Sequence, residues 1–153
     1  MSIGRNFKVE ILEPDGKYVE LAPGDRFSGL ATDLVFPALD GFAGIKPGHA
    51  QMLAGVGIGD LMIIEDRAEG GPRVLHFAIS GGLLEVADGG DVTVYADSIE
   101  YAGAIDCERA RESEERARKR LESKESGTDE ERARAALLRA LNREEIAKKY
   151  GRR

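Results

Sequence analysis

The 153-residue chain has little of several residue types that proteins use for chemistry and cross-linking. It has one cysteine, Cys107, with two histidines and no tryptophan. A single cysteine excludes an internal disulfide, which favours a reducing compartment, and with only two histidines a conventional four-ligand zinc site is excluded. No apolar stretch approaches the roughly 20 residues of a membrane-spanning helix, and the N-terminus leads into no secretory segment. We therefore expect contact with a membrane only through a partner.

Glycine and proline are almost missing from the last third of the chain. All five prolines and all but two of the nineteen glycines lie at or before Gly103. Residues 1–103 carry 7 basic against 16 acidic side chains, a net charge of −9, whereas residues 104–153 carry 15 against 12, a net charge of +3. We predict an acidic domain over residues 1–100 and a basic one over residues 101–153. The overall charge of −6 argues against nucleic acid as the main ligand.

The acidic part has the pattern of many short strands. Phe7, Val9 and Ile11 alternate with charged residues, and turn sequences such as Asp88-Gly89-Gly90-Asp91 recur. This pattern predicts an antiparallel β-sandwich rather than βαβ units. The predicted strands cover residues 7–11, 18–21, 26–27, 33–36, 50–53, 61–64, 74–79, 83–86 and 92–95. Ser80-Gly81-Gly82 is interpreted as a β-bulge or strand junction, not as a nucleophile or phosphate loop.

The basic part predicts two antiparallel α-helices. Cys107, Ala110, Glu114, Ala117 and Leu121 recur at alternating steps of three and four and form one mostly apolar stripe, and a second runs through Ala133, Leu137, Ala140 and Leu141. Between the stripes, Gly127 suits a left-handed helix end and Thr128 to Glu131 suit a capping box. Alanine dominates the seam and buries little area, so we expect a hairpin that detaches easily.

Charge pairing along the predicted helices singles out two arginines. Four acid–base pairs stand four residues apart: Glu112 with Arg116, Glu114 with Arg118, Glu115 with Lys119, and Glu130 with Arg134. Arg139 and Arg143 have no acid three or four residues away, and they share a helical face with Arg132. When the hairpin folds, Arg109 comes to the level of Arg143, so this face could bind a polyphosphate. The alternative is that these arginines point to water or to the acidic sandwich.

Enzyme signatures are scarce. No phosphate-binding Walker loop is present, and His49 and His76 are interpreted as structural. Only Ser80 or His49 could support an enzyme. Asp106 is expected to cap the first helix. We expect no catalytic residue, no metal site and no required cofactor.

Four segments resemble a known family when taken together and in order. They are Gly44-Ile45-Lys46-Pro47-Gly48-His49-Ala50, the stretch from Phe77 to Val86, the stretch from Val92 to Asp97, and Ile105-Asp106-Cys107-Glu108-Arg109-Ala110. Together they resemble the epsilon subunit of bacterial F-type ATP synthase over nearly the full length of the chain. Phe42 and Ala43 stand where that family usually has Glu-Leu, and Lys46 where it often has an apolar residue.

The resemblance implies a regulatory subunit. A β-sandwich would bind the gamma subunit and the membrane rotor ring of c subunits, with Phe42, Lys46 and His49 as candidate contacts. A movable hairpin would extend toward the catalytic beta subunits and block ATP hydrolysis, at the cytoplasmic face of the bacterial inner membrane. ATP, as a regulatory ligand, would bind the folded hairpin at positions that correspond here to Glu100, Ile105, Asp106, Arg109, Arg116, Arg139 and Arg143.

An alternative is a free-standing binding module. The sandwich would then bind a small ligand and the basic hairpin an acidic protein or RNA. The tail has one aromatic residue, Tyr150, on which a base could stack, and this counts against RNA.

Overall fold

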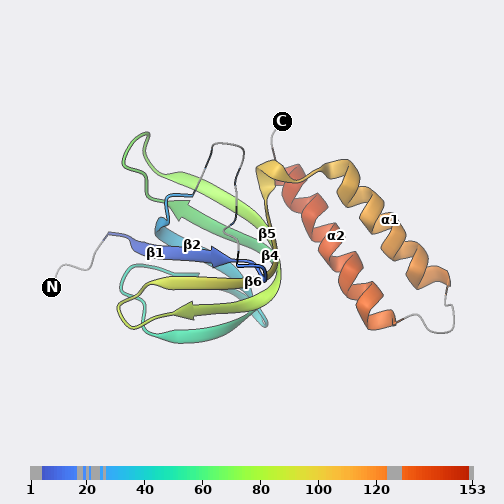
Figure 1. Ribbon diagram of the computed structural model, residues 1–153, viewed down its shortest axis with the longest axis horizontal. Helices are drawn as coiled ribbons and strands as arrows, with labels where there is room; N and C mark the ends of the chain where they lie inside the picture. The colour runs from blue at the N-terminus through green and yellow to red at the C-terminus, as the bar shows by residue number, and fades with distance from the viewer. Residues whose placement is uncertain are drawn as a thin grey trace.

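The computed structural model describes residues 5–16, 19, 21, 25, 27–123 and 129–151. A β-domain forms one side of the molecule and a pair of antiparallel helices the other (Figure 1). The predicted fold class is therefore confirmed. The elements within these residues are β1 (Phe7–Leu12), β2 (Leu30–Ala38), β3 (Gly41–Ile45), β4 (Met52–Glu65), β5 (Arg73–Val86), β6 (Val92–Tyr101), the 3-10 turn η1 (Ala102–Ala104), α1 (Cys107–Ser123) and α2 (Glu130–Tyr150).

The strands form one six-stranded sheet that curls until its ends approach. The strand order is β1-β6-β5-β4-β2-β3, and β1 also pairs with β2. All pairings are antiparallel except β1 with β6, where Val9 lies opposite Val92 in a parallel ladder. The predicted antiparallel sheet thus contains one parallel pair. Two parallel strands need a long connection between the end of one and the start of the other. Here the chain from β2 to β5 forms that connection.

Four predicted strands merge in pairs. Residues 50–53 and 61–64 contribute to β4, and residues 74–79 and 83–86 belong to β5. Gly81 and Gly82 adopt φ values of 75° and 126° and bend β5 without ending it, which confirms the predicted bulge. The structure adds β3, which the sequence did not predict. The predictions at 18–21 and 26–27 fall largely on residues outside the described set, and Phe27 is not in a strand.

The inner face of the sheet holds the main apolar core. Its largest fully buried side chains include Phe36, Phe77, Leu34, Leu61 and Leu75. Outward-facing residues of the same strands are more exposed, as the twofold alternation of a strand requires. One face of the sheet is thus occupied by its own core, and the other is available for the helices.

Glu65 is the one charged residue among the described residues that is buried, with 1% of its surface exposed. Its carboxylate accepts hydrogen bonds from the Ser28 N–H at 2.6 Å and from Arg73 Nε at 2.7 Å. The Arg73 guanidinium also pairs with Asp25 at 2.7 Å. Burial lowers the pKa of Arg73, but the hydrogen bonds to Glu65 and Asp25 outweigh it and raise that pKa. Glu65 and Arg73 thus join the ends of β4 and β5.

Replacing Arg73 with Met should leave the Glu65 carboxylate buried without its main counter-charge. We expect the free energy of unfolding, measured by urea denaturation, to fall by about 3–5 kcal/mol. The matched control is Arg67→Met, which removes an exposed arginine, and the double variant Glu65→Leu/Arg73→Met should regain much of the loss. Equal effects of Arg67→Met and Arg73→Met would contradict this role.

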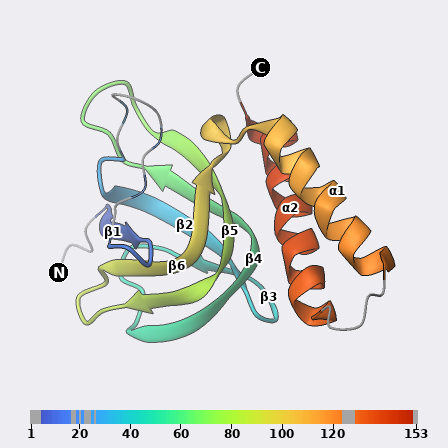
Figure 2. The same cartoon turned by 45° about the vertical axis from the view of Figure 1, so that its right-hand side comes forward.

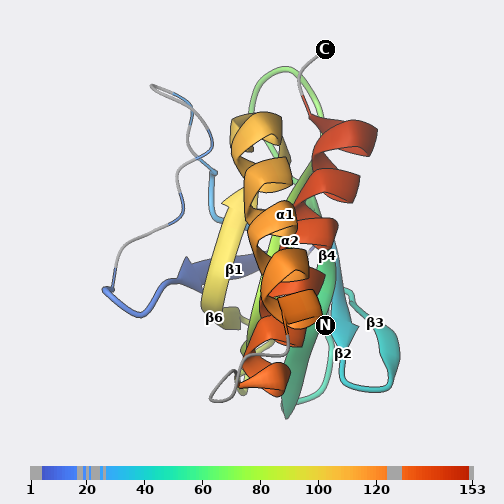
Figure 3. The same cartoon turned by 90° about the vertical axis from the view of Figure 1, so that its right-hand side faces the viewer.

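The two helices stack beside the sheet with α2 inside and α1 outermost (Figure 2). From the hairpin's side, both helices lie in front of the sheet, with β1 and β3 to either side (Figure 3). Alanines fill the seam, as predicted: Ala110 and Ala117 of α1, and Ala133 and Ala140 of α2, are buried. Cys107 was placed wrongly in this stripe, because it is exposed at the first turn of α1.

The start of α2 differs by one residue from the predicted capping box. Asp129 is the N-cap, and its side chain accepts a hydrogen bond from the Arg132 N–H at 3.0 Å. The predicted cap Thr128 and the predicted helix end Gly127 lie outside the described residues. The four predicted acid–base pairs on the helices are all present, with separations from 2.6 to 3.9 Å.

Candidate functional site

The middle of α2 rests on the outer face of β4 and β5 through one amide side chain. Asn142 Nδ2 donates hydrogen bonds to the backbone carbonyls of Gly59, at 2.9 Å, and Ile79, at 3.4 Å. Nearby, Ile146 of α2 forms a small apolar cluster with Ala78 and Ala102. This cluster has few large side chains, so the helix is docked mainly by directed contacts.

Arg143 makes the second docking contact. Its Nε lies 3.3 Å from Glu100 Oε2, and its Nη2 donates a hydrogen bond to Ser98 Oγ at 3.1 Å. Both partners lie on β6. Arg143, which has no acid three or four residues away on its own helix, pairs instead with the sandwich, as the alternative interpretation had it.

The last turn of α2 makes the third contact. The Tyr150 ring stacks on the His76 ring of β5, with 3.5 Å between ring centroids and 1° between ring planes. His76 Nδ1 lies 2.9 Å from an Asp60 carboxylate oxygen on β4. The predicted structural role of His76 is confirmed, since Asp60 orients its ring and Tyr150 covers it.

Replacing Tyr150 with Ala should loosen the C-terminal end of α2. An aromatic pair contributes about 0.5–1.5 kcal/mol beyond its buried area, so amide exchange in the last turns should accelerate roughly 2- to 10-fold. Hydrogen exchange with mass spectrometry on the full chain measures this. The matched control is Lys149→Ala, because Lys149 is exposed and pairs with Glu145 of its own helix. If both variants exchange alike, the ring stack does not hold the helix.

The predicted residues at the start of α1 have separate roles. Asp106 caps the helix as expected, because its Oδ1 accepts a hydrogen bond from the Arg109 N–H at 3.1 Å. Ile105 packs against the cluster around Ile146. The Arg109 side chain is exposed and makes no ion pair with any described residue. Arg116 pairs with Glu112 at 3.7 Å and donates to Ser113 Oγ at 3.0 Å.

A charged bridge crosses the helix seam and sets the relative height of the two helices. Glu144 of α2 lies 3.4 Å from Arg111 of α1 and 2.6 Å from Lys148. The hydrogen bond from Lys148 is the largest of the contacts that keep the pKa of Glu144 below its ordinary value, and Arg111 adds to it. Its contribution to hairpin stability is thus present above the ordinary glutamate pKa and lost as the pH falls through the lowered value. This bridge places the first turns of α1 beside Arg143, as predicted.

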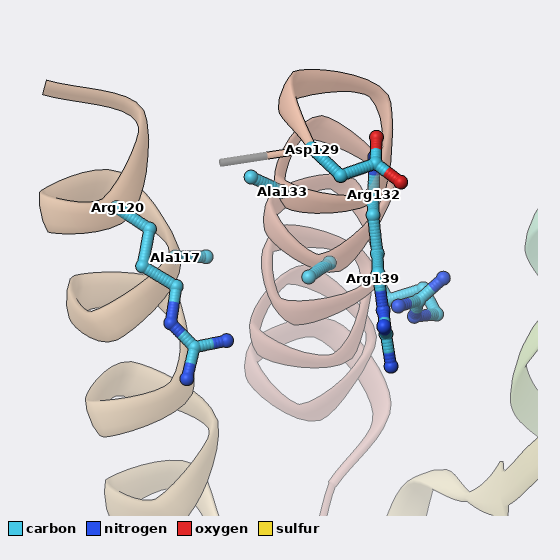
Figure 4. A pocket seen from close by; sticks show the side chains of 7 residues that line it. Ala117, Arg120, Asp129, Arg132, Ala133 and Arg139 are labelled. Carbon is cyan, nitrogen blue, oxygen red and sulfur yellow. The ribbon is translucent and has the colours of Figure 1, made fainter. Parts of the chain in front are cut away.

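The structure therefore brings together only part of the predicted nucleotide set. Glu100 and Arg143 are paired, Ile105 lies close to them, and Asp106 and Arg109 begin the adjoining helix. Arg139 lies elsewhere. It lines a groove of about 490 Å³ with Ala117, Arg120, Asp129, Arg132, Ala133 and Ala136, nearer the end of the hairpin where α2 starts (Figure 4).

The predicted partner contacts lie in and after β3. Phe42 is 70% exposed. Lys46 is 79% exposed and pairs with Asp33 of β2. His49 Nδ1 donates a hydrogen bond to the Ala50 carbonyl at 2.8 Å. These positions are accessible to a partner.

An exposed apolar band on the outer face of the sheet was not predicted. Leu83 of β5 lies opposite both Gly55 of β4 and Tyr95 of β6, so these side chains share a face. Leu39 packs directly over Gly55. The exposed fractions are 79% for Leu39, 68% for Leu53, 47% for Leu83 and 45% for Tyr95. A run of exposed leucines of this size is typical of an interaction surface.

The docking residues Asn142 and Ser98 were also missed. One signal was available for Asn142, because a lone amide within an alanine- and leucine-rich helix is costly to bury unless it is hydrogen-bonded. Ser98 and Asp60 carried no such signal, because only the tertiary fold brings them to their partners, Arg143 and His76.

The fold and the site together define a two-part architecture, in which a β-sandwich holds a helical hairpin through a few directed contacts. Residues 6–102 match the family model for the ATP synthase delta/epsilon chain β-sandwich domain, and residues 104–148 match that for its long α-helix domain. The chain belongs to the ATP synthase delta/epsilon family, as an epsilon subunit of F-type ATP synthase and a component of its central stalk. No helix in the described part of the chain is long and apolar enough to span a bilayer.

Several relatives match over nearly the full chain. The ATP synthase epsilon chain of Caldicellulosiruptor bescii is 37% identical over 92% of this chain and 93% of the relative. That of Bacillus cytotoxicus is 36% identical over 94% and 97%. A chain in the Euglena gracilis mitochondrial ATP synthase structure shares the fold with a TM-score of 0.69 at 20% identity, over 90% of this chain and 79% of that one. These matches favour the stalk subunit over the free-standing module.

Proposed function

We propose that this chain is a non-catalytic regulator of the complex, whose sandwich anchors it to the rotor and whose hairpin acts as a brake on ATP hydrolysis. Its partners would be the gamma subunit, the ring of c subunits and, when the hairpin extends, the catalytic beta subunits. It would reach the cytoplasmic face of the bacterial inner membrane only through this complex. The observation that carries the proposal is the weak, directed docking of α2 on the sheet.

The exposed apolar band offers the gamma subunit a docking surface. Leu39, Leu53, Leu83 and Tyr95 are contiguous across neighbouring strands and carry no charge of their own. Burying one leucine contributes about 1.5–3 kcal/mol, so a few such residues would hold a permanent partner. Phe42, Lys46 and His49 would extend the contact toward the rotor ring.

Replacing Leu83 with Ser should weaken attachment to gamma. We expect the variant's affinity for gamma to fall about 10-fold or more, measured by co-purification from tagged gamma and by titration of the purified chain. The matched control is Val74→Ser, which changes an apolar residue of the same strand that is 52% exposed and lies outside the band. If Val74→Ser weakens attachment as much, the band is not the docking surface.

The brake requires a hairpin with two accessible positions. In the folded position, α2 contributes one amide, one arginine and one aromatic ring to the sandwich, with Ile146 as its largest buried side chain there. Such an interface resembles a transient one, so a difference of a few kcal/mol would decide between the folded and extended positions. Any ligand that binds only one position shifts this balance.

ATP is the ligand we propose for the folded position. Arg143 pairs with Glu100, Asp106 caps the helix on which Arg109 lies, and the contact of Arg111 with Glu144 brings the start of α1 alongside the C-terminal half of α2. Arg109 has no carboxylate partner among the described residues. A triphosphate would supply the missing negative charge. Arg116 and Arg139 would have to turn toward it, because Arg116 pairs with Glu112 and Arg139 lines the groove.

Titration calorimetry of the chain with ATP tests this sensing role. We expect Arg109→Gln to weaken ATP binding about 10-fold or more, because a charge-assisted hydrogen bond contributes about 1.5–3 kcal/mol. Arg134→Gln is the matched control, since it removes the same charge from an exposed, self-paired position. No heat with the unaltered chain would reject ATP sensing, and the stalk role would stand if the chain still co-purifies with gamma.

A further inference from the structure

The tip of the β2–β3 pair, residues 37–42, packs against two glycines of β4. A Cβ added at Gly59 would lie 2.7 Å from Cβ of Pro37 and 3.0 Å from its Cγ. A Cβ added at Gly57 would lie 3.4 Å from the Ala38 carbonyl oxygen, which is an ordinary contact. Pro37 is buried and its ring is rigid, so the ring holds Gly59 at a fixed distance from β2.

The regular pairing of β2 with β4 is interrupted at this contact. From the pair Val35–Met62 to the pair Ala38–Val56, β2 advances three residues while β4 advances six. An irregularity of this kind disrupts the ladder of hydrogen bonds between the two strands. The spacing of the strands at this point is therefore set by packing of the Pro37 ring, and movement of the ring moves the backbone of β4 with it.

One residue joins this contact to the proposed partner surface, and another joins it to the helical hairpin. On β3, Phe42 lies directly opposite Pro37 in the antiparallel register and is 70% exposed. On α2, Asn142 Nδ2 donates a hydrogen bond to the Gly59 carbonyl at 2.9 Å. Phe42, Pro37, Gly59 and Asn142 thus form a continuous series from an exposed side chain to the docked helix.

We propose that the β2–β3 tip controls docking of the helical hairpin through the contact of Pro37 with Gly59. A hydrogen bond is lost beyond roughly 3.5 Å, so the Gly59 carbonyl can move by only about 0.5 Å before Asn142 loses it. The bond of Asn142 to Ile79 is already 3.4 Å long and does not replace it. The tip lies here in the position that suits docking, so a partner that displaces it favours release of α2.

The identity of that partner rests on the proposed function, in which Phe42 contacts the rotor ring. The coupling between the β2–β3 tip and α2 lies within the chain and does not depend on that assignment. A ring that displaces the tip would release the hairpin without touching it. The same surface would then both attach the sandwich and set the position of the brake.

Gly59→Ala tests the coupling, because the added methyl group meets the Pro37 ring rather than α2. We expect amide exchange in residues 142–150 to accelerate roughly 2- to 10-fold, which corresponds to the loss of one hydrogen bond. Hydrogen exchange with mass spectrometry on the full chain measures this. Gly57→Ala is the matched control, since both substitutions restrict the unfolded chain equally but only Gly59→Ala meets a rigid ring. The control should leave exchange in α2 unchanged.

Two further variants separate this coupling from general damage to the sandwich. Pro37→Gly removes the atoms that the methyl group of Gly59→Ala meets, so the double variant should restore slow exchange in α2. Asn142→Leu should in turn accelerate exchange in the β2–β3 tip, because coupling is reciprocal. This variant decides the question even where Gly59→Ala fails to fold. The proposal is overturned if Asn142→Leu leaves the tip unchanged, or if Gly59→Ala accelerates exchange equally in all strands and Pro37→Gly does not reverse it.

The detergent-solubilised rotor ring tests the partner separately. Added to the unaltered chain, it should accelerate exchange in α2, and Phe42→Ser should abolish the effect. Val74→Ser, which changes an exposed apolar residue outside the tip, should retain it. Ring binding that leaves α2 unchanged would overturn control of the hairpin by the ring. No ring binding, together with the expected effects of Gly59→Ala and Asn142→Leu, would reject the ring contact of the proposed function and leave the coupling within the chain supported.

Discussion

The close approach of α2 to the backbone of the sheet is the contact on which the arrangement of the two parts depends. The Asn142 amide reaches the carbonyls of Gly59 and Ile79, on two neighbouring strands. Gly59 itself has no room for a side chain, because an added Cβ would lie 2.7 Å from the Pro37 ring. A larger residue there would displace β2 or β4 and move the carbonyl that Asn142 needs. Local sheet packing thus fixes where the helix can sit.

This mode of docking explains how a stable sandwich can carry a detachable hairpin. The sandwich has a continuous core of large side chains on its inner face, so it does not need the helices to cover that core. The hairpin contributes mostly alanine to its own seam and mostly polar contacts to the sheet. Polar contacts can exchange with water when the helix leaves, whereas exposure of a large apolar face would not be tolerated. Release of the hairpin from the sandwich therefore costs little free energy in either part.

Sequence patterns predicted the fold class and the helices well because their signals are local. The alternation in residues 7–11 and the alanine repeats at Ala110, Ala117, Ala133 and Ala140 require only the periods of a strand and a helix. Glycines do not always end a strand in this chain. Gly81 and Gly82 bend a continuous strand, and Gly41 begins β3 rather than a loop. The parallel pairing of β1 with β6 depends on closure of the whole sheet, which no local pattern encodes.

The candidate site was predictable in composition but not in geometry. The absence of acids three or four residues from Arg139 and Arg143 identified both as unusual, yet tertiary contacts separate them. Arg143 pairs with Glu100 on a strand, while Arg139, one helical turn earlier, lines the groove between the helices. Two arginines with the same local sequence environment thus acquire different electrostatic roles. The difference arises because the described ion pair from α2 to the sandwich is made only at Arg143, in the C-terminal half of the helix.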